Sequence, residues 1–228
     1  TSVISALLTD TRNSRRGRRK NVGEFRDMGD LAARLHTELI RGTLASHSCP
    51  PNDELARCLG VDEPAVEAAL RELAAIHGVV LHPHICRPWV AHPFCFTPTM
   101  HWVERDGRGW WAPCLWCAFG VAALAGGEVR IHTRIAAESD AIVIAVRDGR
   151  PEAAAPLWVH FAIPPSKAWN NVHQHCALVV PFRSVDAIDR WCASEWDDGI
   201  TRSSSSSIAG IVRSAGSSIG SVSRPRSA

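Results

Sequence analysis

The chain has 228 residues, of which 46% are hydrophobic and 21% are charged, and its formal net charge is +2. This size allows one or two domains, and the near-neutral charge gives no general electrostatic reason to bind nucleic acid or a membrane. Since no apolar run approaches the roughly 18 residues of a membrane span and no secretory signal pattern begins the chain, we expect a cytoplasmic protein.

The N-terminal part divides into a basic arm and a small helical domain. Residues 1–21 carry a cluster of arginines among polar residues and are expected to be disordered. Within 22–91, apolar residues at helical spacing predict a helix from Asp30, a short second helix that ends at Gly60, and a third after Asp62 that runs to Gly78. A hairpin over 79–90 follows, so we expect a winged-helix-like domain.

A helix that enters the major groove of DNA would be the third one of such a domain. Its exposed positions include Glu63, Glu67 and Glu72, and acidic side chains repel phosphate. DNA binding is therefore the less favoured interpretation of this domain.

The segment 92–200 contains more strand signals and predicts an α+β core with a mainly antiparallel sheet. Expected strands are centred on 100–103, 109–111, 129–135, 141–146 and 157–163, and expected helices cover about 116–126 and 185–196. Residues 173–180 fit either a helix or a strand. The remaining residues, 201–228, contain a serine run and no acidic residue, and are expected to form a flexible tail.

Eight cysteines are spread along the chain at a density below that of a disulfide scaffold, so we expect free thiols in a reducing compartment. The strongest local motif is Cys114-Leu115-Trp116-Cys117. This spacing serves structural zinc, redox exchange or capture of a soft metal by thiolates. A second Cys-x-x-Cys for zinc is absent, and the βαβ context of a redox pair is not predicted, which leaves soft-metal capture favoured.

Two segments together resemble the organomercurial (alkylmercury) lyases. They are Trp116-Cys117-Ala118 after a Trp-rich hairpin, and the later run from Cys176 to Ser184. The resemblance extends over about 92–196, and the three-helix domain suits that family as well. It implies protonolytic cleavage of a carbon–mercury bond, with Cys117 as the attacking thiolate and Cys176 as the second mercury ligand.

The resemblance also implies the partners of the reaction. The substrate would be a small organomercurial, the products a hydrocarbon and Hg(II), and no cofactor would be built in. An external low-molecular-weight thiol would remove the bound ion, and a mercury reductase would act downstream.

One position departs from the family pattern. The family has an acid three residues after the first cysteine, which carries the proton to the leaving carbon, and this chain has Gly120 there. Cys114 is our candidate for proton donor or third thiolate ligand, with His173 and His175 as weaker candidates, and an acid restored at position 120 is expected to raise protonolysis. The alternative is a thiolate protein that binds or senses copper or mercury without lyase activity.

Overall fold

A computed structural model describes residues 29–136, 138–152, 157–161, 172–195, 208–212 and 221–222. The basic arm expected at 1–21 lies outside these residues. Among the described helices none is long and apolar enough to cross a membrane.

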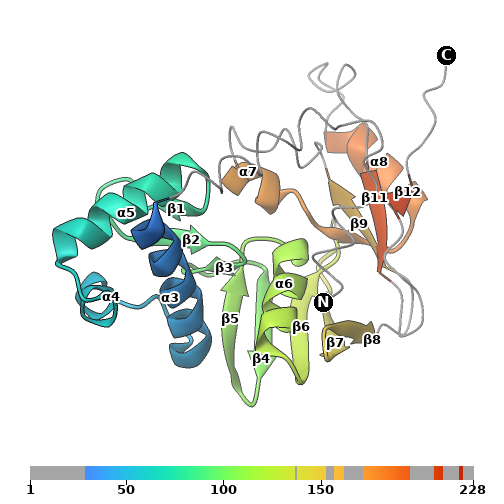
Figure 1. Ribbon diagram of the computed structural model, residues 1–228. Helices are drawn as coiled ribbons and strands as arrows, with labels where there is room; N and C mark the ends of the chain where they lie inside the picture. The colour runs from blue at the N-terminus through green and yellow to red at the C-terminus, as the bar shows by residue number, and fades with distance from the viewer. Residues whose placement is uncertain are drawn as a thin grey trace.

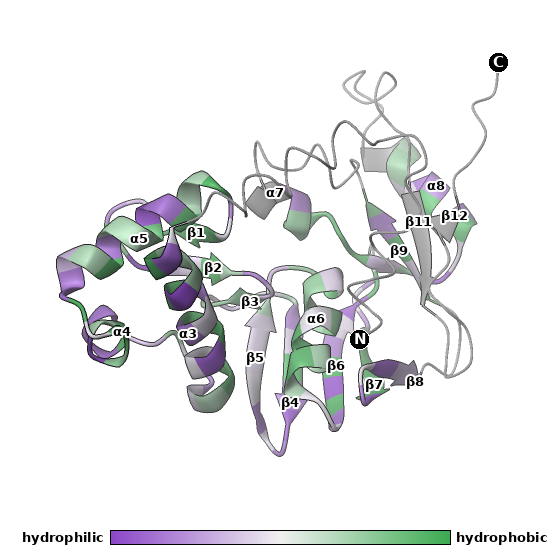
Figure 2. Cartoon of the chain, in the orientation of Figure 1, coloured by the Kyte–Doolittle hydropathy of each residue, from purple (hydrophilic) through white to green (hydrophobic). Residues whose placement is uncertain are grey.

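The N-terminal helices form where the sequence predicts them, because their end signals are local. They are α3 (Asp30–Ser46), α4 (Asn52–Leu59) and α5 (Glu63–Ala75). Gly60 ends α4 with a φ of 70°, a left-handed conformation that glycine adopts without strain. The Asp62 side chain caps α5 by accepting a hydrogen bond from the Ala65 amide at 3.0 Å. These helices bury their apolar faces against one another, and Figure 2 shows hydrophilic residues on the outer sides of α3 and α5.

The hairpin behind these helices is part of a larger sheet. Eight strands pair antiparallel in the order β1-β2-β3-β5-β4-β6-β7-β8. They are β1 (Val79–Leu81), β2 (Pro88–Ala91), β3 (Phe94–Cys95), β4 (His101–Arg105), β5 (Arg108–Ala112), β6 (Glu128–Arg134), β7 (Ala141–Arg147) and β8 (Arg150–Glu152). Because the two-residue strand β3 pairs with both β2 and β5, the hairpin of the helical domain continues into the core sheet.

A single apolar helix, α6 (Leu115–Ala125), packs on this sheet (Figure 1). It is pale to green along its length in Figure 2, and residues from more than one side of it are buried. A helix that is apolar all round is buried between other elements. The prediction placed its start near Trp116, whereas the helix starts at Leu115 because Cys114 acts as its N-cap.

A second sheet has the order β10-β9-β11-β12 and is also antiparallel. Its strands are β9 (Leu157–Phe161), β10 (Pro181–Phe182), β11 (Ile208–Val212) and β12 (Ser221–Val222), and it is accompanied by α7 (Val172–Ala177) and α8 (Val185–Glu195). Strands β11 and β12 lie within 201–228, the segment for which the sequence predicts a flexible tail. Ile208, Ile211 and Val212 are β-branched, which favours pairing with β9.

Hydrogen bonds join the elements across the molecule. The indole nitrogen of Trp110 on β5 donates to the Thr43 carbonyl of α3 at 2.8 Å, and the Trp110 ring stacks on His47 with centroids 4.5 Å apart. The Ala136 amide after β6 donates to the Pro181 carbonyl of β10 at 3.0 Å. These contacts tie α3 to β5 and the second sheet to the chain after β6.

Candidate active site

The first two cysteines are held on one turn at the start of α6. Cys114 has extended backbone, and its sulfur accepts a hydrogen bond from the Cys117 amide at 3.2 Å. A thiol thus serves where Ser, Thr, Asp or Asn usually caps a helix. Because of this hydrogen bond, Cys114 and Cys117 lie close together, as their spacing in the sequence predicts.

The third cysteine comes from α7. The turn after α7 is closed by the Val179 amide, which donates to the Cys176 carbonyl at 3.1 Å. The Val179 carbonyl in turn accepts from the amide of Leu115, the first residue of α6, at 3.3 Å. The chain after Cys176 is therefore tied to the start of α6, and the thiols of Cys114 and Cys117 form hydrogen bonds with Cys176.

His92, in the loop between β2 and β3, completes the cluster. Its Nδ1 lies 3.7 Å from the Cys117 sulfur, and ligand atoms of His92, Cys117 and Cys176 all lie within 4.8 Å of one another. Cys114 and Cys176 are buried, whereas His92 and Cys117 are partly exposed. A substrate would therefore approach from the side of His92 and Cys117.

His92 was not among the candidate residues predicted from the sequence. It shares a two-residue loop with Pro93, and its distance from Cys117 depends on how β2 and β3 pair and how α6 packs above them. A histidine next to a proline at the end of an apolar strand was the only local signal, and it is a weak one.

The pKa values of the three thiols shift in different directions. The pKa of the Cys176 thiol is lowered because Cys114 and Cys117 donate hydrogen bonds to it and, to a smaller extent, because the imidazoles of His92 and His175 lie nearby. The pKa of Cys117 is raised by its hydrogen bonds with Cys114 and Cys176 and by burial. Burial is the main cause that raises the pKa of Cys114. The sequence had assigned the thiolate to Cys117, and this hydrogen bonding favours the reverse order.

Two other imidazoles, those of His101 and His175, interact electrostatically with Cys176. His101 on β4 bonds through Nδ1 with the Thr133 hydroxyl at 2.9 Å, and burial lowers its pKa to about 4. His175 is buried, its pKa is lowered by burial, and the charge of Cys176 opposes that shift. On α3, the pKa of His36 is lowered by burial and by the nearby imidazole of His92. His173 lies in α7, and its side chain is outside the described part of the structure.

Gly120, the position at which the resemblance implies an acid, faces the loop that carries His92. A Cβ added to Gly120 would lie 3.1 Å from Pro93 Cβ and 3.4 Å from Pro93 Cγ. The first distance is tighter than ordinary van der Waals contact, so a side chain at position 120 would press on the residue next to His92.

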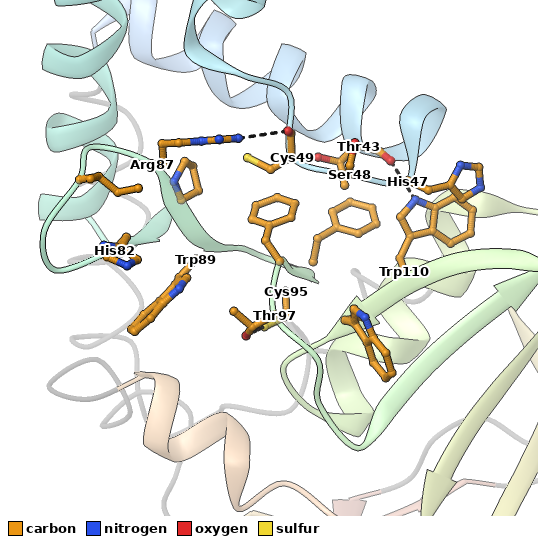
Figure 3. A pocket seen from close by; sticks show the side chains of 15 residues that line it. Thr43, His47, Ser48, Cys49, His82, Arg87, Trp89, Cys95, Thr97 and Trp110 are labelled. Atoms are coloured by element: carbon orange, nitrogen blue, oxygen red, sulfur yellow. Dashed lines mark hydrogen bonds between the residues drawn. The ribbon is translucent and has the colours of Figure 1, made fainter.

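A separate cavity of about 410 Å³ lies between α3 and the first sheet (Figure 3). Its labelled side chains include Cys49, Cys95, Trp89 and Trp110. The Cys95 sulfur contacts the Thr97 hydroxyl at 3.3 Å, and Arg87 donates to the Cys49 carbonyl at 3.5 Å. None of the three clustered cysteines lines this cavity, so it is distinct from the thiol site.

Cys117, Cys176 and the imidazole of His92 form a group of ligand atoms without a carboxylate, and Cys114 lies beside it. Such a donor set on an α+β scaffold suits a soft, thiophilic metal. The family model for alkylmercury lyase (MerB) matches residues 94–213, more than half of the chain. The chain belongs to the alkylmercury lyase family and is a lyase-like enzyme.

The solved structures support the same fold. The chain is similar to the protein described as "Crystal structure of the mercury-bound form of MerB2", with 18% identity and a TM-score of 0.59. The alignment covers 78% of this chain and 86% of that one. No curated protein matches the sequence. The family match includes β11, and it begins just after His92, so that residue lies outside the matched region.

Proposed function

We propose that this protein cleaves the carbon–mercury bond of small organomercurials by protonolysis, with Cys176 and Cys117 as the residues that take up the mercury. The observation that carries the proposal is the cluster of Cys117, Cys176 and His92, whose ligand atoms lie within 4.8 Å of one another, with Cys114 beside Cys117 at the start of α6. Thiolate sulfur is the softest ligand that a protein offers, so it selects Hg(II) over harder ions.

Cys176 and Cys117 start in different protonation states, and this difference sets the order in which they bind mercury. Cys176 is the thiolate and attacks the mercury first, displacing the ligand on which the organomercurial arrived. Cys117 begins as a thiol and becomes the second mercury ligand as it gives up its proton. With two sulfurs bound, mercury receives the electron density that allows its bond to carbon to break.

Cys114 takes a supporting part. Its sulfur caps α6 and donates a hydrogen bond to Cys176, so it holds the charge on that sulfur before substrate arrives. After the reaction it lies close enough to become a third ligand to Hg(II). We propose that a low-molecular-weight thiol then removes the ion by exchange, since a bis-thiolate complex would otherwise hold it, and that a reductase acts on the released mercury.

The test uses the full chain, methylmercury chloride and an excess of a small thiol, and measures methane in the headspace. Wild-type protein should release methane over several turnovers, and Cys117→Ser and Cys176→Ser should reduce release to the level of buffer. Cys58→Ser is the matched control, because Cys58 is exposed on α4, and it should behave like wild type.

A different result would assign another function. If wild-type protein binds mercury through Cys117 and Cys176 but releases no methane, the protein is a thiolate metal-binding protein on this fold and the lyase proposal is wrong.

A further inference from the structure

The proposed reaction needs a proton at the departing carbon, and the residue that supplies it in the family pattern is absent here. Gly120 has no side chain to carry a proton. A positioned proton donor is worth about 10²–10⁴-fold in rate. The chain therefore requires a donor from another part of the fold.

The space in front of Gly120 is occupied by the loop between β2 and β3. Pro93 lies against Gly120, at 3.1 Å from the position of an added Cβ. The residue before it, His92, has its Nδ1 3.7 Å from Cys117 Sγ. Because position 120 has no side chain, Pro93 packs against it, and this packing brings His92 close to Cys117.

We propose that His92 is the catalytic residue that carries the proton from the Cys117 thiol to the departing carbon. The inference rests on the proposed lyase function. His92 suits the task because its ligand atom lies within 4.8 Å of the sulfurs of both Cys117 and Cys176, where the mercury and its carbon substituent would be held.

The step balances without an outside acid. The substrate R–Hg–X loses X⁻ to solvent as the Cys176 thiolate binds mercury. His92 Nδ1 accepts the Cys117 proton while that sulfur forms the second S–Hg bond. The C–Hg bond then breaks with its electron pair on carbon, and His92 returns the proton to form R–H. Mercury stays divalent throughout, and His92 ends in its starting state.

The other candidates fit this task less well. The buried sulfur of Cys114 accepts a hydrogen bond from the Cys117 amide, and its thiol donates one to Cys176. Cys114 therefore already acts as both an acceptor and a donor. His175 neighbours Cys176 in sequence, but it does not belong to the group of ligand atoms within 4.8 Å. Geometry thus favours His92 over each of them.

The experiment compares His92→Asn with wild type in single-turnover release of methane from methylmercury. Asparagine places an amide near the position of Nδ1 and cannot relay a proton. We expect binding of one methylmercury per chain to persist through the thiols, while the rate of methane release falls about 10²–10⁴-fold. In His92→Ala, added imidazole should restore part of the rate, which a purely structural role would not produce.

Two histidine variants serve as comparisons. His132→Asn removes an imidazole that pairs with Glu104 at 2.7 Å on the sheet, and should leave release unchanged. His175→Asn tests the competing donor. If His92→Asn releases methane at the wild-type rate, or if the loss appears in His175→Asn or Cys114→Ser instead, His92 is not the donor although the lyase function stands. If wild type itself releases none, both proposals fail together.

Discussion

Cys114, Cys117 and Cys176 differ in the direction of their pKa shifts. The pKa of Cys176 is lowered because both other thiols donate hydrogen bonds to it, whereas the pKa values of Cys117 and Cys114 are raised. The helix N-terminus at Cys117 would ordinarily favour a thiolate there. Here the Cys117 amide donates to Cys114, and the hydrogen bonds among the thiols outweigh the helix dipole.

This arrangement predicts the pH dependence of the free thiols. Since the pKa of Cys176 is lowered, its thiolate persists below the pH range in which an ordinary cysteine, with a pKa of about 8.5, loses its charge. A titration followed by thiolate ultraviolet absorbance should therefore show one thiolate already present at about pH 6. That signal should be missing in Cys176→Ser.

A companion variant identifies the cause. Cys117→Ala removes one of the two hydrogen bonds to Cys176, so ionisation of Cys176 should move to higher pH, toward the usual value. An unchanged titration in Cys117→Ala would show that the nearby imidazoles of His92 and His175, rather than the thiol hydrogen bonds, set the pKa of Cys176.

At the scale of elements, the site depends on how α6 packs against the loop between β2 and β3. Helix α6 has a glycine at position 120, and Pro93 of the loop occupies the space that a side chain at this position would need. From the sequence alone, restoring an acid at position 120 was expected to raise protonolysis. The contact with Pro93 changes that expectation, because the new side chain would displace the loop that carries His92.

We therefore predict opposite effects of Gly120→Asp in two backgrounds. In wild type it should lower methane release, since it pushes His92 away from Cys117. In His92→Asn it should raise release by about tenfold or more, since the carboxyl group then supplies the proton. The measurement is the same single-turnover assay on all four combinations.

Gly120→Ala is the control, because it adds the Cβ without the carboxyl group. It should reproduce the loss in the wild-type background and give no gain in His92→Asn. An increase for Gly120→Asp in wild type would mean that the acid and His92 fit the site together and that the loop gives way.

Elements with local end signals were predictable, and elements defined by pairing were not. Gly60 and Asp62 mark helix boundaries through their own backbone and side chain, so their helices were placed correctly. The strands β3 and β10 have two residues each and exist because longer strands lie beside them. His92 belongs to the same category, since its role follows from the β3 pairing and not from its sequence neighbours.

The contact between Cys117 and Cys176 was also outside the reach of local patterns. Residue types alone indicated thiolate chemistry at Cys114 and Cys117, and the family resemblance supplied Cys176. In the structure the contact depends on the hydrogen bond from the Leu115 amide to the Val179 carbonyl, a link between distant segments that has no signature in either one.

At the scale of the whole molecule, the continuous first sheet joins the helical part to the core. The Trp110 indole strengthens the junction by donating to the Thr43 carbonyl across the boundary. Since the sheet and this bond cross from one part to the other, we expect both parts to unfold in one cooperative transition.

Trp110→Phe tests this connection. It removes the indole donor, while the Thr43 carbonyl still accepts from the His47 amide at 2.9 Å. The loss of this one hydrogen bond should cost about 0.5–1.5 kcal/mol, or about 2–4 °C in Tm for each kcal/mol. Far-ultraviolet circular dichroism and tryptophan fluorescence should report the same lowered midpoint. Trp89→Phe is the control, because Trp89 is 38% exposed, and it should change stability little. Two separated transitions in Trp110→Phe would show that the helical part and the core fold independently.

The N-cap of α6 has a consequence for the release of mercury from the site. Cys114 holds the first turn of the helix in place with the same sulfur that can be drawn toward Hg(II). If Hg(II) binds the Cys114 sulfur as the proposed third ligand, we expect the first turn of α6 to lose its N-cap and the backbone at Cys117 to become more mobile while the metal is still bound. Binding of mercury would then weaken the helix turn that positions its ligand Cys117, which favours transfer of the ion to an incoming thiol.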